Sequence, residues 1–231
     1  MNPGRNEPPI VGRPWTVLGT GLVIAVLVAG MLAVAAAWPA AQAAVLDLDV
    51  RVHGWTTGRD GGVLIAASHV LALLGSVWVT APLRVVIGLV LAWRRWWWRL
   101  GAWVGSIALS EVVTTAMKEG YDRARPPLAL EATRSAAFPS GHSSAVAVTV
   151  LCLVVLILPE RRRDRRVWAA AGLVVAAMAI SRVVLRVHWV SDVVVGILVG
   201  VAAGLVAIGL AARCQAAFSR RRQGRASSVP R

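Results

Sequence analysis

Three short segments of the chain combine cations, small residues, histidines and a carboxylate at fixed spacing. The first is Lys118-x6-Arg125-Pro126, the second is Pro-Ser-Gly-His at residues 139–142, and the third is Ser-Arg-x5-His-x3-Asp at residues 181–192. Hydrolysis of a phosphate ester requires groups that neutralise the phosphate oxygens, a nucleophile that attacks phosphorus and an acid that protonates the leaving oxygen. The three segments contain residue types suited to each task.

Phosphate binding is expected from three cations and one turn. Lys118, Arg125 and Arg182 can neutralise the oxygens, since the arginine fork matches phosphate geometry and lysine supplies a point charge. Ser140 is expected to cap the helix that follows it, so that free N–H groups and the positive end of the helix dipole face an anion. Gly141 lets the backbone approach that anion closely.

The histidines divide the remaining tasks. His188 and Asp192 are four residues apart, so a helix would place both on one face. Asp192 can then accept a proton from one nitrogen of His188 and leave the other nitrogen free to attack phosphorus. His142 remains as the acid. Taken singly, each motif also fits a structural role, as a cationic helix end, a helix start or a His–Asp pair. No metal is expected, because three cations crowd the motifs and no ligand spacing is present.

The three motifs resemble the signature of the type 2 phosphatidic acid phosphatase superfamily, also called lipid phosphate phosphatases. Every fixed position of that signature is present between Lys118 and Asp192. The resemblance implies a phosphohistidine on His188 oriented by Asp192, with His142 as the acid and no cofactor. It also implies that the phosphate is held by five residues, which are Lys118, Arg125, Ser140, Gly141 and Arg182. Ser181 belongs to the signature too, but it also suits a capping or packing role.

Most of the chain reads as membrane helix. The sequence has 231 residues, 57% of them hydrophobic, and its apolar runs reach the roughly 18 residues that a helix needs to cross a bilayer. We expect an all-α polytopic membrane protein, a bundle of about six transmembrane helices. The runs are residues 15–38, 63–93, 100–117, 141–158, 167–184 and 189–212. The first is longer than a signal-peptide core, which favours a retained span.

The expected organisation has one domain and two tails. Residues 1–14 form a flexible tail, residues 15–212 the six-span domain and residues 213–231 a basic tail, with a loop at residues 47–62. The active-site segments are residues 118–142 and 181–192. Two spans separate the second motif from the third, so both are expected at the same membrane face.

The positive charge predicts an orientation. The net charge is +14, and with six spans sixteen of the 25 basic residues lie on the side of both termini, against eight on the side of the motifs. The positive-inside rule then places both termini in the cytoplasm and the site outward, in the plasma membrane. Because the arginines cluster beside apolar runs, nucleic-acid binding is not expected.

Several features outside the motifs are structural candidates. The run at residues 63–93 contains Pro82 and is expected to be one kinked helix, with Arg84 either functional, internally paired or snorkelling. Trp96–Trp98, beside arginines, indicates an interfacial anchor. A glycine stripe every four residues indicates close helix packing, and it consists of Gly196, Gly200 and Gly204.

The expected function is hydrolysis of a phosphomonoester or diphosphate on a lipid. Polyprenyl diphosphate (including undecaprenyl diphosphate), phosphatidic acid and phosphatidylglycerol phosphate all fit, and the expected partners are this lipid and the bilayer. One alternative is a membrane protein that binds or transports a lipid phosphate without hydrolysing it. Another is a vanadate-dependent haloperoxidase, whose signature is similar, but those enzymes are soluble and the apolar runs argue against this reading.

Overall fold

The structure, a computed structural model, describes residues 7–58, 62–133 and 135–227, and the regular structure in these ranges is helical, with no strand. A π-helical turn, Leu153–Ile157, extends α6, and a 3-10 turn, Glu160–Arg162, follows it. The α-helices are α1 (Pro14–Ala37), α2 (Pro39–Thr57), α3 (Gly62–Leu74), α4 (Val77–Trp93), α5 (Trp97–Tyr121), α6 (Gly141–Cys152), α7 (Arg165–Val184) and α8 (Val190–Ser227).

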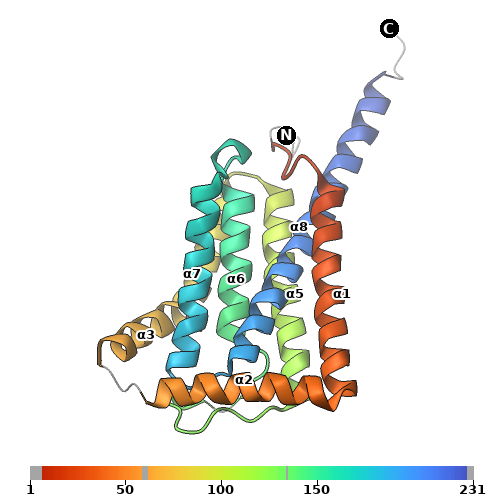
Figure 1. Cartoon of the computed structure of the whole chain (residues 1–231). Coiled ribbons are helices and arrows are strands. Elements are labelled where there is room, and N and C mark those ends of the chain that lie inside the picture. The colour runs from red at the N-terminus through yellow and green to blue at the C-terminus, as the bar shows by residue number, and fades with distance from the viewer. Residues whose placement is uncertain (1–6, 59–61, 134, 228–231) are drawn as a thin grey trace.

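The bundle has the dimensions of a membrane domain. Helices α1, α5, α6, α7 and α8 run side by side, and α2 lies across one end of them (Figure 1). Within the described residues, four helices, α1, α5, α7 and α8, are long and apolar enough to cross a bilayer. Helices α3 and α4 reach that length only together, and they are bent by 41° at the break between them. The fourth predicted run, seen as Gly141–Ile157, is apolar but shorter. The prediction of an all-α polytopic membrane protein is therefore confirmed.

Helix α2 corrects the predicted loop at residues 47–62. The chain is helical from Pro39 to Thr57, because proline suits the first helical position and the alanines that follow favour helix. Most of α2 is exposed, but Asp49 is only 1% exposed and Thr56 is 5% exposed. A search for span-length apolar runs misses such a helix, since one of its faces is polar.

The apolar run at residues 63–93 is two helices instead of one. The chain breaks at Gly75 and Ser76, between α3 and α4. A Cβ atom at Gly75 would meet the flexible end of the Met178 side chain on α7, so that side chain would have to shift to admit a larger residue. Pro82 lies inside α4 and does not end it.

The predicted flexible N-terminal tail is packed wherever the structure describes it. The Glu7 carboxylate accepts hydrogen bonds from the N–H groups of Trp98 (3.1 Å) and Arg99 (2.9 Å), so it caps α5 from outside the helix. Ile10 is 1% exposed, and its N–H donates to Gln215 Oε1 on α8 (3.1 Å). Residues 7–12 are therefore part of the fold.

The other tail differs as well, because α8 continues to Ser227, well past the predicted end of its run at Ala212. Arginine, glutamine and alanine dominate this stretch, and all three have high helix propensity. The end of α8 projects beyond the bundle (Figure 1).

Arg84 is paired inside the bundle, one of the two structural readings of this residue. Its guanidinium donates to Thr149 Oγ1 (3.1 Å), to the Ala145 carbonyl (2.9 Å) and to the Glu111 carboxylate (3.2 Å). These contacts join α4 to α5 and α6. A charge at this depth is stabilised only when it is paired and hydrogen-bonded, as it is here.

The tryptophan cluster holds arginines at the opposite end from α2. The guanidinium carbons of Arg94 and Arg99 lie 5.3 and 5.0 Å from the centre of the Trp96 ring. Arg99 also donates to the carbonyl of Leu156, in the π-helical turn. Anchoring at the membrane interface stays a prediction for this cluster.

The glycine stripe of α8 packs against α6, which confirms its predicted structural role. A Cβ at Gly196 would lie 2.5 Å from the carbonyl oxygen of Ser140, and one at Gly204 would lie 2.7 Å from Leu151 Cδ2. A Cβ at Gly200 would collide with the carbonyl oxygen of Ser144. Helices α6 and α8 therefore approach as closely as their backbones allow.

Gly200→Ala is expected to lower the melting temperature in detergent, because forcing a methyl group into a packed contact costs about 1–3 kcal/mol. The matched control is Gly172→Ala on α7, where no atom lies within 4 Å of the added Cβ. That control is expected to be neutral or slightly stabilising, since alanine favours helix over glycine. Equal melting temperatures for the two variants would contradict the close packing.

Candidate functional site

Four helix ends meet at the end of the bundle that α2 covers (Figure 1). Lys118 lies in the last turn of α5 and Ser140 caps the start of α6. Arg182 lies in the last turn of α7, and Asp192 lies in the first turn of α8. The predicted placement of all three motifs at one end is confirmed.

Direct contacts join the three motifs. The Ser140 N–H donates to the carbonyl of Asp192 (2.9 Å) and links the second motif to the third. Arg125 Nη1 lies 3.4 Å from His188 Nε2 and links the first motif to the third. A Cβ at Gly141 would lie 3.9 Å from Lys118 Cε, so the first motif also borders the second.

The turn at Ser140 has the predicted cap. Ser140 is fully buried. Its Oγ accepts from the backbone N–H of Ser143 (3.4 Å) and from the hydroxyl of Ser143 (3.1 Å). His142 follows in the first turn of α6, where its ring lies near Gly75: a Cβ on that glycine would be 3.5 Å from His142 Cδ2. The break between α3 and α4 therefore borders this histidine.

The loop between α5 and α6 holds two of the predicted cations. Lys118 Nζ donates to the carbonyl of Ala136 (2.5 Å). Arg125 donates from Nε to the Ser135 carbonyl (2.9 Å) and from Nη1 to the Val187 carbonyl (2.5 Å). Both cations are thus fixed by backbone oxygens on either side of the site and keep further donors for a ligand.

Arg182 is 2% exposed and carries an unused donor. Its Nη1 donates to Glu131 Oε2 (3.1 Å), while Nη2 is buried and finds no hydrogen-bond partner among the described residues. An unpaired buried donor is costly, so this nitrogen suits an anionic ligand. Sequence reasoning missed Glu131, which also lies 3.2 Å from His69 Nδ1, because it stands in a loop without a motif.

His188 is 4% exposed, and its two nitrogens face different groups. Nδ1 lies 3.4 Å from Asp192 Oδ2 without the alignment of a hydrogen bond, and Nε2 faces Arg125. Burial is the main cause that lowers the pKa of His188, and the interaction with Asp192 opposes it. A lowered pKa keeps this imidazole neutral at physiological pH.

Asp192 is fully buried and accepts hydrogen bonds at both oxygens. The Trp189 N–H donates to Oδ2 (2.9 Å) and Arg123 Nη1 donates to Oδ1 (2.6 Å). Arg123 stands outside the fixed positions of the three motifs. The structure places it between two carboxylates, because its Nη2 also donates to Asp49 Oδ2 of α2 (2.7 Å).

Two other expectations concern Ser181 and metal ligands. Ser181 Oγ donates to the carbonyl of Met178 (2.7 Å), so its contact is the packing one. No group of three or more His, Cys, Asp or Glu side chains in the described ranges is arranged to hold a metal ion.

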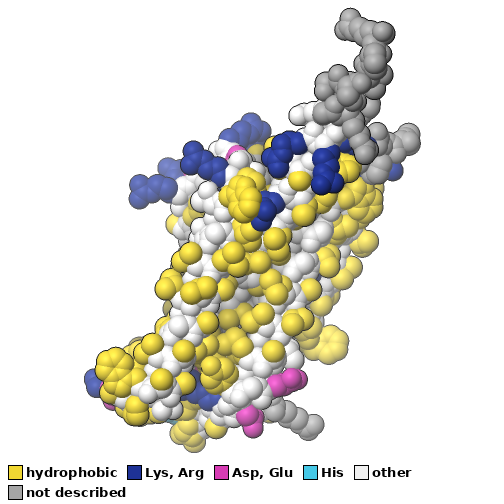
Figure 2. Space-filling view, turned by 90° about the vertical axis from the view of Figure 1, so that its right-hand side faces the viewer, with side chains coloured by type: hydrophobic (Ala, Val, Ile, Leu, Met, Phe, Trp, Pro, Cys, Tyr) yellow, Lys and Arg dark blue, Asp and Glu magenta, His cyan; other side chains and the backbone are white. Residues whose placement is uncertain are grey.

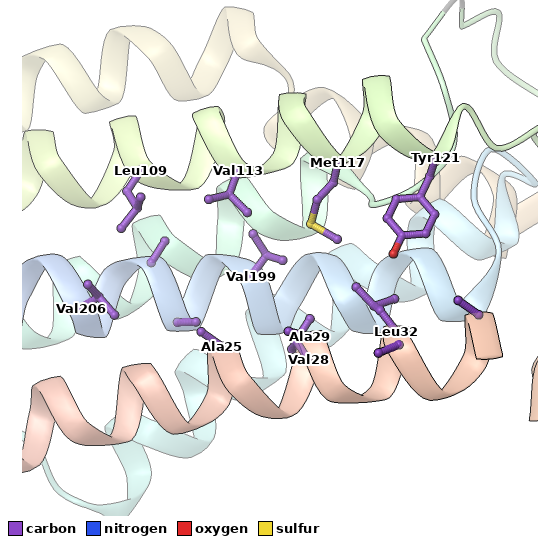
Figure 3. Close-up of a pocket in the computed structure, with 14 residues that line it drawn as sticks. Ala25, Val28, Ala29, Leu32, Leu109, Val113, Met117, Tyr121, Val199 and Val206 are labelled. Atoms are coloured by element: carbon purple, nitrogen blue, oxygen red, sulfur yellow. The ribbon is translucent and has the colours of Figure 1, made fainter. Parts of the chain in front are cut away.

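A groove of about 600 Å³ runs between α1, α5 and α8 beside the site. Figure 3 shows apolar side chains of the three helices pointing into it. Its α5 wall is a stripe that passes Met117 and ends at Tyr121, on either side of Lys118. The Tyr121 ring packs edge-on against Phe138 (centroids 4.9 Å apart), which directly precedes the Pro-Ser-Gly-His turn. The groove therefore ends beside two of the three motifs.

The sequence pattern of the PAP2 superfamily matches residues 99–215, half of the chain, and this range contains all three motifs. The chain belongs to the PAP2 superfamily. Phosphatidylglycerophosphatase B of Bacillus subtilis (strain 168) is 32% identical to this PAP2 chain over 132 residues. That match covers 55% of this chain and 65% of the relative, just under two thirds of its length.

Two solved structures share the fold of this PAP2 chain. The first transmembrane PAP2 type phosphatidylglycerolphosphate phosphatase from Bacillus subtilis superposes with a TM-score of 0.65 at 25% identity, over 87% of this chain and 96% of that one. LpxE of Aquifex aeolicus superposes with a TM-score of 0.57 at 20% identity, over 68% and 93% of the two chains. The second likeness concerns the fold alone.

Proposed function

We propose that this PAP2 protein is a metal-independent lipid phosphatase that forms a phosphohistidine on His188. The observation that carries the proposal is the environment of this imidazole. It is buried and held neutral, with Nδ1 beside a carboxylate and Nε2 beside a cation that can bind phosphate. The unpaired Nη2 of Arg182 supports the same conclusion, since an anion would satisfy it.

In the proposed reaction the phosphate oxygens are bound by the N–H groups at the start of α6 and by three cations, which are Lys118, Arg125 and Arg182. His188 Nε2 forms a bond to phosphorus while the bond from phosphorus to the lipid oxygen breaks. His142 gives a proton to that oxygen. His142 then takes a proton from water, the resulting hydroxyl group bonds to phosphorus, and the P–N bond breaks to release phosphate and neutral His188. Asp192 stabilises the positive charge on the imidazole throughout.

The apolar groove supports a lipid as the substrate. Its volume of about 600 Å³ lies in the usual range of ligand sites, roughly 300–1,000 Å³. Its apolar lining can make van der Waals contacts with an acyl or prenyl chain. The name of the Bacillus subtilis relative makes phosphatidylglycerol phosphate the first lipid to test. Phosphatidic acid and polyprenyl diphosphate are the other candidates.

The charge distribution supports an outward-facing site in the plasma membrane. Figure 2 shows arginines gathered at the end of the molecule away from α2, with a hydrophobic flank between the two ends. The positive-inside rule places that end in the cytoplasm. The site, at the other end, then faces outward, where a lipid headgroup reaches it from the outer leaflet.

Phosphate release by the purified protein in detergent, with a chelator present, tests the proposed function. The panel contains phosphatidylglycerol phosphate, phosphatidic acid, polyprenyl diphosphate and glycerol 3-phosphate, which has a phosphate but no apolar chain. Chelator-resistant release from a lipid, with much slower release from glycerol 3-phosphate, is the expected result. Binding of the lipids without release would instead support the transport or binding alternative.

The lowered pKa of His188 gives a prediction with a direct readout. Burial disfavours the imidazolium, so His188 is expected to stay neutral at pH values below the ordinary histidine pKa of about 6.5 and to charge only in more acidic solution. Titration of 15N-histidine-labelled protein by NMR checks this, because the chain has only 4 histidines and a His188→Asn variant assigns the signal. A His188 pKa at or above 6.5 would contradict the neutral nucleophile.

A further inference from the structure

We infer that Asp49 of helix α2 is a positioning residue for the reaction, acting through Arg123 on the His188–Asp192 pair. None of the three motifs contains Asp49, which lies about 70 residues before the first of them. The inference rests on the proposed function of His188. It gives α2, which lies across the end of the bundle, a role in catalysis rather than in membrane crossing.

Among the described residues, the hydrogen bonds of the Asp49 carboxylate go to residues beside the catalytic pair. Oδ2 accepts from Arg123 Nη2 (2.7 Å) and from Ser191 Oγ (2.6 Å), and Oδ1 accepts from the Ser191 N–H (3.0 Å). The side chain is 1% exposed. A buried carboxylate is stable only with such compensation, so the site and α2 hold each other in one arrangement.

Arg123 is shared between two carboxylates. While Nη2 binds Asp49, Nη1 donates to Asp192 Oδ1 (2.6 Å) and to Ser191 Oγ (2.7 Å). Asp49 therefore balances part of the guanidinium charge and fixes its plane. The catalytic carboxylate is left with its other oxygen toward His188 Nδ1 and with enough negative charge to stabilise an imidazolium there.

The same face of α2 holds the turn that carries His188. His53 follows Asp49 by one helical turn, and its ring packs edge-on against Trp189 (centroids 5.5 Å apart). One further turn along, the Thr56 carbonyl accepts from Arg186 Nη2 (2.9 Å). Three successive turns of α2 thus contact residues 186–191, which is the spacing of one helix face.

The hydrogen bond from the Ser191 N–H to Asp49 also fixes the start of α8. Ser191 is the second residue of α8, and N–H groups in the first turn have no partner within their own helix. Asp49 supplies an acceptor to this one from a separate helix, as an N-cap side chain would. Because Asp192 is the next residue, a shift of Ser191 would move the catalytic carboxylate directly.

Asp49→Asn tests the inference, because it removes the charge and keeps the size. The variant is expected to lower kcat about 10- to 100-fold, the usual loss when a group that orients a catalytic residue is removed, with KM for the lipid nearly unchanged. Asp47→Asn is the matched control: it lies on the exposed side of the same helix, paired with Arg51, and is expected to behave as wild type. Equal kcat for the two variants would overturn the inference.

A double-mutant cycle with Arg123→Gln separates positioning from general stability. If Asp49 acts through Arg123, adding Asp49→Asn to Arg123→Gln lowers kcat little further. Independent, multiplying losses accompanied by a lower melting temperature would show a merely structural role. Should Asp49→Asn fail to fold, Ser191→Ala decides, since it removes only the hydroxyl that joins Asp49 and Arg123. A lower kcat at an unchanged melting temperature supports the inference, and an unchanged kcat overturns it.

His188→Ala, assayed beside these variants, distinguishes the two levels of the argument. If His188→Ala is inactive and Asp49→Asn matches Asp47→Asn, only the role of Asp49 fails. If His188→Ala is as active as wild type, the proposed function of the site fails, whatever Asp49 does.

Discussion

Replacing His188 with alanine is expected to abolish phosphate release, with a fall in kcat of about 10⁴-fold or more, because removing a nucleophile leaves only the catalysis due to binding. The step that is lost should be the formation of the covalent phosphoenzyme. Wild-type protein given a radiolabelled substrate and quenched in alkali should carry a label that acid removes, as a P–N bond requires. The His188→Ala variant should carry none.

His142→Ala is the matched comparison for that experiment. It keeps the nucleophile but removes the group proposed to activate water, so the phosphoenzyme should form and persist. An aryl phosphate is the suitable substrate, because its leaving group departs without an acid. The phosphohistidine would be contradicted if His188→Ala carried a label. It would also be contradicted if neither His142→Ala nor the wild-type protein carried one.

Asp192→Asn is expected to lower kcat by about 10³- to 10⁴-fold, the size of loss seen when the carboxylate that orients a catalytic histidine becomes an amide. Donors face both oxygens of Asp192, from Arg123 on one side and from Trp189 on the other. An amide has one oxygen and one NH₂ group, so either orientation places donor against donor. His188 then loses the group that selects its tautomer.

The control for this variant is Asp122→Asn, which makes the same charge change just after α5. Asp122 is exposed and has a positive φ of 36°, a region that asparagine tolerates well, and wild-type kcat is expected. The measurement is lipid phosphate release together with the melting temperature of each variant. Near-wild-type kcat in Asp192→Asn would show that the carboxylate does not orient the nucleophile.

The sequence was sufficient to predict the motif residues and their common end of the bundle for a physical reason. His188 and Asp192 stand one helical turn apart, and Ser140 begins a helix, so local geometry alone constrains them. The count of intervening spans then placed the segments on one face. The roles of these residues stay predictions until the variants are measured.

Partners that are distant in sequence could not be predicted in the same way. Asp49, Glu131 and Glu7 each contact a group far along the chain, and no local pattern connects the members of such pairs. The polar face of α2, with Asp49, His53 and Thr56 at helical spacing, was the one available signal. Because the polar residues of this segment keep it from forming a span-length apolar run, the sequence predicted a connection here.

The break at Gly75 shows a different limit. Proline is the usual local cause of a bent helix, so Pro82 was the natural candidate. The chain bends instead where α7 presses against it, and Gly75 is the residue without a side chain at that contact. The Gly75–Ser76 pair is also a common place for a helix kink, so the sequence contained a local signal for the break besides Pro82.

The packed segment at residues 7–12 has a practical consequence for recombinant work. A protease site or fusion joint placed within it would remove the Glu7 acceptor from two N–H groups of α5. It would also break the hydrogen bond from the Ile10 N–H to Gln215. Handles are better joined to the far end of α8, which stands clear of the bundle (Figure 1). In detergent, a fusion at the far end of α8 leaves the packing of residues 7–12 intact, so a measured activity then reflects the site and not a partly unfolded protein.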